Sequence, residues 1–299
     1  MIYNTLLKAF AGFALCISVI SCNVSPNPIT SSYNYASPTE VIILPDTLRE
    51  VSGVAILDST TVSFIQDENG ILFTYSLRDK RMSNQQAFAI DGDYEEITRV
   101  GKTLYILRSD GTIFEIADYQ NAASNVDTFN TGIPAADNEG LCYDKANNRL
   151  LIACKSKLDK RAGDKDTRAI YGFDLTTKTL SNEPVYNFDL KDIKKFAEDN
   201  NLDIPQSKKK GKNGGGPDIK FKTSAIDIHP ITKKLYLLSA ADHMLFIFNL
   251  DGKLEHIEVL DAQRYNKAEG LAFFANGDML ITNEAQDKKP TLLRLNYNK

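Results

Sequence analysis

The sequence predicts an all-β fold: a five-bladed β-propeller, closed by an N-terminal strand and carrying one short helical insertion. A short motif recurs at the start of a strand pattern, with its key position at Ser52, Glu95, Glu139, Ser224 and Glu269. Successive copies are 43, 44, 85 and 45 residues apart, and a period near 44 is typical of four-stranded blades. Between the copies, short alternating apolar runs are separated by Gly, Asn and Asp, which indicates strands and hairpins.

The first 21 residues have the features of a signal peptide. Lys8 precedes an apolar run over residues 9–20, which is too short to span a bilayer as a helix. The run ends in a Val-Ile-Ser-Cys sequence that resembles the lipobox of bacterial lipoproteins. This resemblance implies cleavage before Cys22 and acylation of its thiol, and a plain signal peptide is the alternative. Residues 22–39, rich in Ser, Asn and Pro, are expected to form a flexible tether.

The residue after Cys22 is Asn23 and not an aspartate, which favours the outer membrane of a bacterial cell envelope. We expect the lipid to be the only attachment to the membrane, and the protein to be a monomer. The net charge of −4, with no basic face that the sequence can localise, gives no support to sequence-independent binding of nucleic acid, and none is expected.

The propeller domain is expected over residues 40–299 and begins with a lone strand at 41–44. This strand supplies the strand that the last blade lacks and so closes the ring. In the first three blades the expected strands are residues 54–57, 62–66, 71–77 and 87–90; 96–100, 103–107, 112–116 and 126–129; 140–143, 150–153, 169–175 and 185–188. In the last two they are residues 225–229, 235–238, 244–250 and 256–260; 270–274, 279–282 and 292–295.

The interval of 85 residues leaves the blade count open. Insertions are expected at about residues 155–168 and 190–221. Within the second, Leu190, Ile193 and Phe196 share one helical face, and Asp189 is a suitable N-cap. A helix and a Lys/Gly-rich loop account for the excess length, which favours five blades; six blades is the alternative.

The first strand of each blade lines the central channel of a propeller, so the key residues are expected to form a ring at one end of it. Hairpin spacing places a second residue beside each key residue. These partners, in blade order, are Asp67, Arg108, Cys154 (with Lys155 next to it), Ser239 and Glu284.

This ring concentrates carboxylates, which cannot all remain ionised unless something compensates them. Arg108 and Lys155 are one compensation, protonation is a second, and a hard cation such as Ca²⁺ is a third. Oxygen ligands suit calcium or magnesium and not zinc, and Glu95, Glu139 and Glu269 are the candidate ligands. The alternative is that the glutamates and serines only hydrogen-bond the backbone of neighbouring blades.

Two cysteines, Cys142 and Cys154, belong to the expected domain. If Asp144 pairs with Arg149 across a hairpin, Cys142 faces Leu151 and Cys154 faces Glu139. The two thiols are then separated, and both are expected to be free and buried.

Several of these segments resemble the SdiA-regulated family of bacterial envelope proteins. The resemblance is carried by residues 93–97, 138–141 with 151–155, 224–230, 237–239 and 267–272. It implies a β-propeller related in style to NHL-repeat proteins, with metal binding in the channel. Glu96 departs from the glycine usual in the family, and Ala225 replaces another glycine.

Together these observations favour a lipid-anchored, non-enzymatic protein that binds an envelope protein or a small ligand through loops on a rigid scaffold. The alternative is a calcium-dependent hydrolase, such as a lactonase or phosphoesterase, in which the ion polarises the substrate and a carboxylate activates water. With only three histidines, no Ser-His-Asp set can be assembled.

Overall fold

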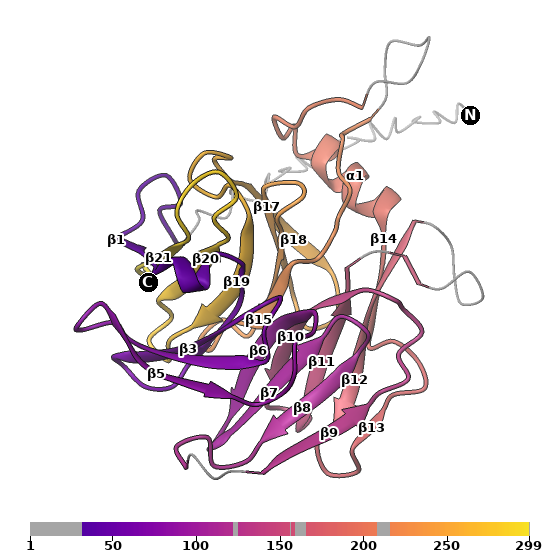
Figure 1. Ribbon diagram of the computed structural model, residues 1–299. Coiled ribbons are helices and arrows are strands. Elements are labelled where there is room, and N and C mark those ends of the chain that lie inside the picture. Colours follow the sequence, from indigo (N-terminus) through magenta and orange to yellow (C-terminus); the bar gives the residue numbers. More distant parts are fainter. Residues whose placement is uncertain (1–31, 122–124, 156, 159–165, 208–215, 299) are drawn as a thin grey trace, which may run out of the picture. The chain divides into compact units, whose positions relative to one another are not determined.

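The computed structural model describes residues 32–121, 125–155, 157–158, 166–207 and 216–298. The predicted signal peptide and Cys22 lie outside them. Residues 31–299 form one compact unit, in which five antiparallel sheets are arranged around an axis as the blades of a propeller (Figure 1). Among the described residues, no helix has the length and apolar character needed to cross a membrane.

Each blade runs outward from an inner strand to its outer ones, and the five-bladed prediction is confirmed. Blade one contains β2 (Val51–Ile56), β3 (Thr61–Gln66), β4 (Ile71–Ser76) and β5 (Arg81–Ala87). Blade two contains β6 (Tyr94–Val100), β7 (Thr103–Arg108), β8 (Thr112–Ile116) and β9 (Val126–Asn130). Blade three contains β10 (Asn138–Asp144), β11 (Arg149–Cys154), β12 (Thr167–Asp174), β13 (Thr179–Leu180) and β14 (Tyr186–Asp189). Blade four contains β15 (Ala225–Ile228), β16 (Leu235–Ser239), β17 (Met244–Phe248) and β18 (Leu254–Val259).

The last blade is built from both ends of the described chain. Its strands are β19 (Ala268–Phe273), β20 (Met279–Asn283) and β21 (Thr291–Leu295), and the outer position is filled by β1 (Glu40–Ile43). Val41 pairs with Leu293 in antiparallel register. The predicted closure is therefore confirmed, and it satisfies backbone groups that an open edge would expose. A single 3-10 turn, Asp46–Leu48, leads from this strand into blade one.

The hydrophobic core is divided into five clusters, one between each pair of neighbouring blades. Val54 of blade one and Leu280 of blade five share a cluster, so the ring closes through packing as well as through β1. The inner strands approach closely: a side chain at Gly53 would lie 2.8 Å from the backbone nitrogen of Ile97. Glycine at this position therefore permits β2 and β6 to pack side by side.

The described residues of the long third interval form a helix and no further blade. Helix α1 (Leu190–Asp199) begins at Asp189, whose carboxylate accepts a hydrogen bond from the Lys191 amide at 2.8 Å, as predicted. Ile193 and Ala197 face the core between blades three and four. The outer edge of blade three is shared by β13 and β14, which both pair with β12. Most of the Lys/Gly-rich loop, 208–215, lies outside the described residues.

The tether prediction is wrong for residues 32–37, because two tyrosines there have surfaces to bury. Tyr33 and Tyr35 are 4% and 6% exposed and pack between blades four and five. The Tyr33 hydroxyl donates to the Gly277 carbonyl at 2.6 Å and contacts Nε2 of His229 at 2.7 Å. Nδ1 of His229 accepts from two backbone amides, so Nε2 carries the proton and donates to Tyr33.

Both cysteines are free and buried, as predicted. Cys142 faces Leu151, also as predicted, but the residue opposite Cys154 is Asn138 and not Glu139. The register shifts at Glu139, which is an extra residue in β10.

Candidate functional site

A polar cavity of about 330 Å³ lies where the inner strands begin. Seven of the ten predicted channel residues line it. They are Ser52, Asp67, Glu95, Glu139, Lys155, Glu269 and Glu284. The structure adds six residues to its wall: Glu50, Asp93, Ser109, Ala136, Asp137 and Lys267. We call this hollow the acidic cavity.

β-Bulges place the key side chains in the acidic cavity. The ladder between β6 and β7 skips Glu95, that between β10 and β11 skips Glu139, and that between β19 and β20 skips Glu269. In β2 the ladder passes over Ser52 in the same way. A bulge adds a residue to one strand and re-aims its side chain, so these residues point toward the axis instead of following the pleat.

Three predicted residues lie elsewhere, and the bulge at Glu95 explains the first of them. Arg108 pairs with Tyr94 in the β6–β7 ladder and forms an ion pair with Asp110, with an N–O distance of 2.7 Å. Ser109, the next residue, lines the cavity in its place. Ser239 is buried and donates to Asp242 at 2.6 Å. Ser224 donates to the carbonyl of Ala268 in the next blade at 2.8 Å.

The two key serines join neighbouring blades. Ser52 donates to the Tyr94 carbonyl at 2.7 Å, just as Ser224 does to Ala268. Both serines therefore hydrogen-bond the backbone of a neighbouring blade, which is the role that the sequence offered as the alternative to a cation site. The glutamates at the other key positions are oriented differently and reach into the cavity.

Two lysines compensate part of the negative charge. Lys155 forms an ion pair with Glu139 and lies 3.9 Å from Asp137. Lys267 pairs with Glu284 and lies 3.5 Å from Glu269. Lys155 was expected from the sequence, whereas Lys267 was missed.

A period of two could have revealed the missed residues. Glu50, Asp93, Asp137 and Lys267 each precede a key residue by two positions. Each lies just before an inner strand begins, so charged residues at this offset extend the lining of the cavity beyond the strand ends.

Burial and mutual repulsion raise the pKa values of the carboxyls. Burial, followed by the charge of Glu139, raises the pKa of Glu95 to about 10. Burial and the nearby Glu50 raise the pKa of Asp67 to about 6. The pKa values of Glu139 and Glu269 are also raised, mainly by burial, although Lys155 and Lys267 act in the opposite direction. The cavity therefore holds more carboxylate than its lysines can stabilise in the ionised form.

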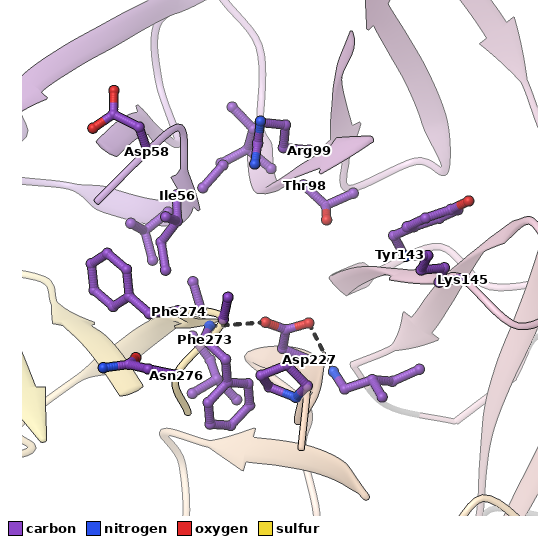
Figure 2. Close-up of a pocket in the computed structure, with 18 of the residues that line it drawn as sticks. Ile56, Asp58, Thr98, Arg99, Tyr143, Lys145, Asp227, Phe273, Phe274 and Asn276 are labelled. Carbon is purple, nitrogen blue, oxygen red and sulfur yellow. Dashed lines mark hydrogen bonds between the residues drawn. The ribbon is translucent and has the colours of Figure 1, made fainter. Parts of the chain in front are cut away.

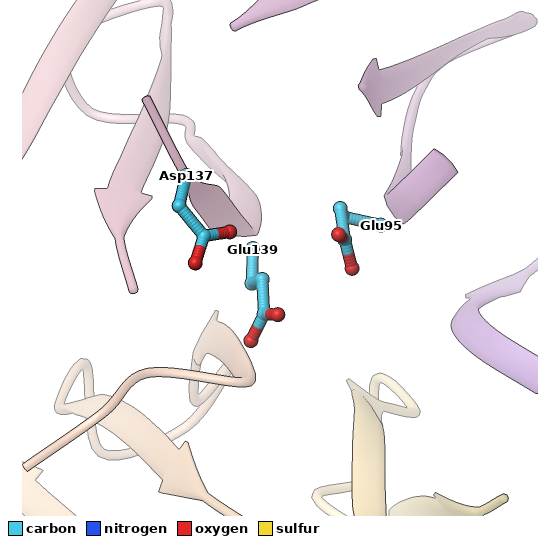
Figure 3. Close-up of side chains that lie close together, drawn as sticks. All are labelled: Glu95, Asp137 and Glu139. Atoms are coloured by element: carbon cyan, nitrogen blue, oxygen red, sulfur yellow. The ribbon is translucent and has the colours of Figure 1, made fainter. Parts of the chain in front are cut away.

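Three carboxyls converge closely enough to share an ion. One oxygen each of Glu95, Asp137 and Glu139 lies within 4.8 Å of the others, and the three side chains reach into the same space from blades two and three (Figure 3). Of the predicted ligands, Glu95 and Glu139 belong to this group. Asp137 takes the third place, whereas Glu269 faces Lys267.

Comparison with known proteins supports the fold. No family model matches the chain, and no curated protein matches its sequence. Glutaminyl cyclase of Myxococcus xanthus is similar in structure, with a TM-score of 0.58, 12% identity, and coverage of 88% of this chain and 96% of that one. The fold is a β-propeller.

Two further structures resemble it less. A streptogramin B lyase has a TM-score of 0.46 at 10% identity, covering 86% of this chain and 97% of that one. A luciferin-regenerating enzyme has a TM-score of 0.47 at 11% identity, covering 87% and 95%. At such low identities the likeness extends to the propeller fold alone.

Glu96 lies in β6, beside Gly53 of β2. It is 1% exposed, and its Oε1 accepts from the backbone amides of Val54 at 3.3 Å and Ile97 at 3.0 Å. Its Oε2 has no hydrogen-bond partner among the described residues. Burial holds the pKa of this carboxyl well above its usual value, and its hydrogen bond with Val54 links β2 to β6.

Proposed function

We propose that this chain is a lipid-anchored cell-envelope propeller that binds its partner without catalysing a reaction, and that its acidic cavity holds a calcium ion. The calcium site rests on one observation: one carboxylate oxygen each of Glu95, Asp137 and Glu139 lies within 4.8 Å of the others. Three carboxylate oxygens, completed by water or by a ligand, suit a hard divalent cation.

The charge balance of the acidic cavity supports this proposal. Eight carboxyls line it, against two lysines. Lys155 and Lys267 lie beside Glu139 and Glu284, and Glu95 has no ion pair among the described residues. A cation at the three converging carboxyls would offset the cost of burying their ionised forms.

The envelope part of the proposal rests on the sequence. The apolar run over residues 9–20 and the lipobox-like sequence ending at Cys22 support export and acylation. Mass spectrometry of the protein expressed in a bacterial host tests this part. A mature N-terminus at Cys22 carrying acyl chains is expected, and an intact residue 1 or an unmodified Cys22 would contradict it.

Thermal unfolding with and without chelator tests the cation. Calcium should raise the Tm of the wild-type protein, because a ligand that binds only the folded state stabilises it by about 2.7 kcal/mol at a hundred times its Kd. Glu95→Gln should abolish most of this increase. Asp127→Asn, which removes one charge from the exposed outer strand β9, should not. An unchanged wild-type Tm in calcium would contradict the proposal.

A second candidate, a calcium-dependent lactonase or phosphoesterase, is supported by one observation. Glu139 combines a raised pKa with contact to Lys155 and a place in the converging group, which are properties of a general base beside a metal. Lactone, ester and phosphodiester substrates, tested with calcium on the wild type and on Glu139→Gln, separate the two candidates. Turnover that Glu139→Gln abolishes would favour the hydrolase.

A further inference from the structure

A second and larger cavity, of about 760 Å³, lies farther along the same inner strands. It is lined by residues from the C-terminal halves of β2, β6, β10, β15 and β19, whereas the acidic cavity lies where four of these strands begin. No residue lines both hollows. We call this second hollow the axial pocket.

The volume and lining of the axial pocket fit a small organic ligand. Sites for such ligands are typically ~300–1,000 Å³, with apolar walls and a few placed polar groups. The apolar wall includes Ile97, Leu141 and Leu271, which are buried, together with Ile56 and Phe273, which are partly exposed.

One carboxylate, Asp227, is held in a fixed orientation at the axial pocket. Its Oδ1 accepts from the Ile228 amide at 2.8 Å and its Oδ2 from the Phe273 amide at 3.1 Å, so both ends of the group are anchored to backbone (Figure 2). No cationic side chain forms an ion pair with Asp227 among the described residues. Each oxygen can accept a further hydrogen bond, and a ligand ammonium is the group that an unpaired carboxylate binds most strongly.

Two cations lie elsewhere on the wall of the same pocket. Arg99 and Lys145 are exposed, and neither forms an ion pair within the described part of the chain. Arg99 donates one hydrogen bond to the Gly101 carbonyl at 3.1 Å, which leaves other guanidinium donors available. Figure 2 shows Arg99 on β6 and Lys145 just after the end of β10, whereas Asp227 is on β15.

Two further charged groups line the axial pocket, and of these only Arg294 has an ion pair. Asp58 accepts from the amide and hydroxyl of Thr60, at 2.7 and 3.0 Å. Arg294 pairs with Asp278 at 2.6 Å. The charged groups without an ion pair are thus the anchored carboxylate of Asp227, the exposed carboxylate of Asp58 and the two exposed cations, with apolar surface in the same cavity.

We propose that the axial pocket binds a short apolar peptide or apolar amino acid as a zwitterion, with its ammonium on Asp227 and its carboxylate on Arg99 and Lys145. The side chains of the ligand would cover the apolar wall, and burial of this apolar surface would contribute most of the favourable binding free energy. Burial raises the pKa of Asp227 to about 7, and a bound ammonium would restore its ionised form.

Isothermal titration calorimetry with three related peptides at pH 7.5 tests this proposal. The probes are Leu-Leu, N-acetyl-Leu-Leu and Leu-Leu amide, which remove one terminal charge at a time. Because hydrogen bonds to charged groups contribute about 1.5–3 kcal/mol, each modified peptide should bind at least ~10-fold more weakly than Leu-Leu.

Variants assign each end of the peptide. Asp227→Asn should remove the discrimination between Leu-Leu and its acetylated form. Arg99→Gln combined with Lys145→Gln should remove that between Leu-Leu and its amide, and these exposed changes leave the fold intact. Asp127→Asn and Arg81→Gln, on exposed outer strands, serve as matched controls and should leave all three affinities unchanged.

Two results would overturn the assignment. One is equal affinity of the wild type for the three peptides, or no saturable binding of Leu-Leu. The other is an unchanged preference for free Leu-Leu over its amide in the Arg99 and Lys145 double variant.

Discussion

Replacing Glu96 by glutamine tests the expectation that its buried carboxyl is neutral in the folded state. Glutamine has the same shape and keeps the oxygen that accepts from Val54 and Ile97, but it cannot ionise. In the wild type, burial holds the pKa of Glu96 well above 4.5. We expect this carboxyl to stay protonated in the folded state at neutral pH and to ionise on unfolding. The unfolded state therefore gains stability as pH rises above 4.5.

The magnitude follows from the unfolded pKa alone, provided that the folded carboxyl remains protonated at pH 7. The interval between the unfolded pKa of 4.5 and pH 7 is about 2.5 pH units, which corresponds to about 3 kcal/mol of unfolding free energy. Glu96→Gln should therefore unfold with nearly the wild-type free energy at pH 4 and be more stable than the wild type by about 3 kcal/mol at pH 7.

Urea unfolding at the two pH values measures this difference, with Glu115→Gln as a control on blade two, where the replaced carboxylate is paired with Lys178. An effect of Glu96→Gln that is the same at pH 4 and pH 7, or a loss of stability at pH 7, would refute the protonated state.

Three further predictions concern stability. Asp189→Ala removes the acceptor for the Lys191 amide and should lower the free energy of unfolding by about 1 kcal/mol in guanidinium titrations; no change would show that α1 does not depend on this cap. Tyr33→Phe leaves the His229 ring N–H and the Gly277 carbonyl without the hydroxyl they contact and should cost about 1–3 kcal/mol, whereas an unaffected Tm would contradict the attachment of residues 32–37. Burial lowers the pKa of His229 from 6.5 to about 4, so the unfolded state takes up its proton first and the wild type should lose up to about 3 kcal/mol between pH 6.5 and pH 4. The His229→Gln variant should lack that component, and an identical pH dependence would contradict it.

The architecture could be predicted because its signals are local. Strand lengths, hairpin residues and the spacing of the key positions specify the blades, and the unpaired outer place in blade five identifies the role of β1. Helix α1 was predictable for the same reason, from the face containing Ile193 and from the cap at Asp189.

The site was harder to predict because it depends on irregularities in pairing. Regular hairpin spacing places Arg108 beside Glu95, but the bulge at Glu95 moves Arg108 away from the axis and brings Ser109 to the cavity. Asp137 lies just before β10, two positions ahead of the bulged Glu139, and this recurring charged position is visible in the sequence. The partners of Tyr33 could not be predicted from its neighbours, because Gly277 and His229 are about two hundred residues away in the chain.

Crystals grown with calcium and measured for anomalous scattering test the central claim most directly. An anomalous peak within about 2.3–2.6 Å of carboxylate oxygens of Glu95, Asp137 and Glu139 is expected. An acidic cavity without such a peak, with the lysine amines as the only cations beside these carboxyls, would contradict the calcium site.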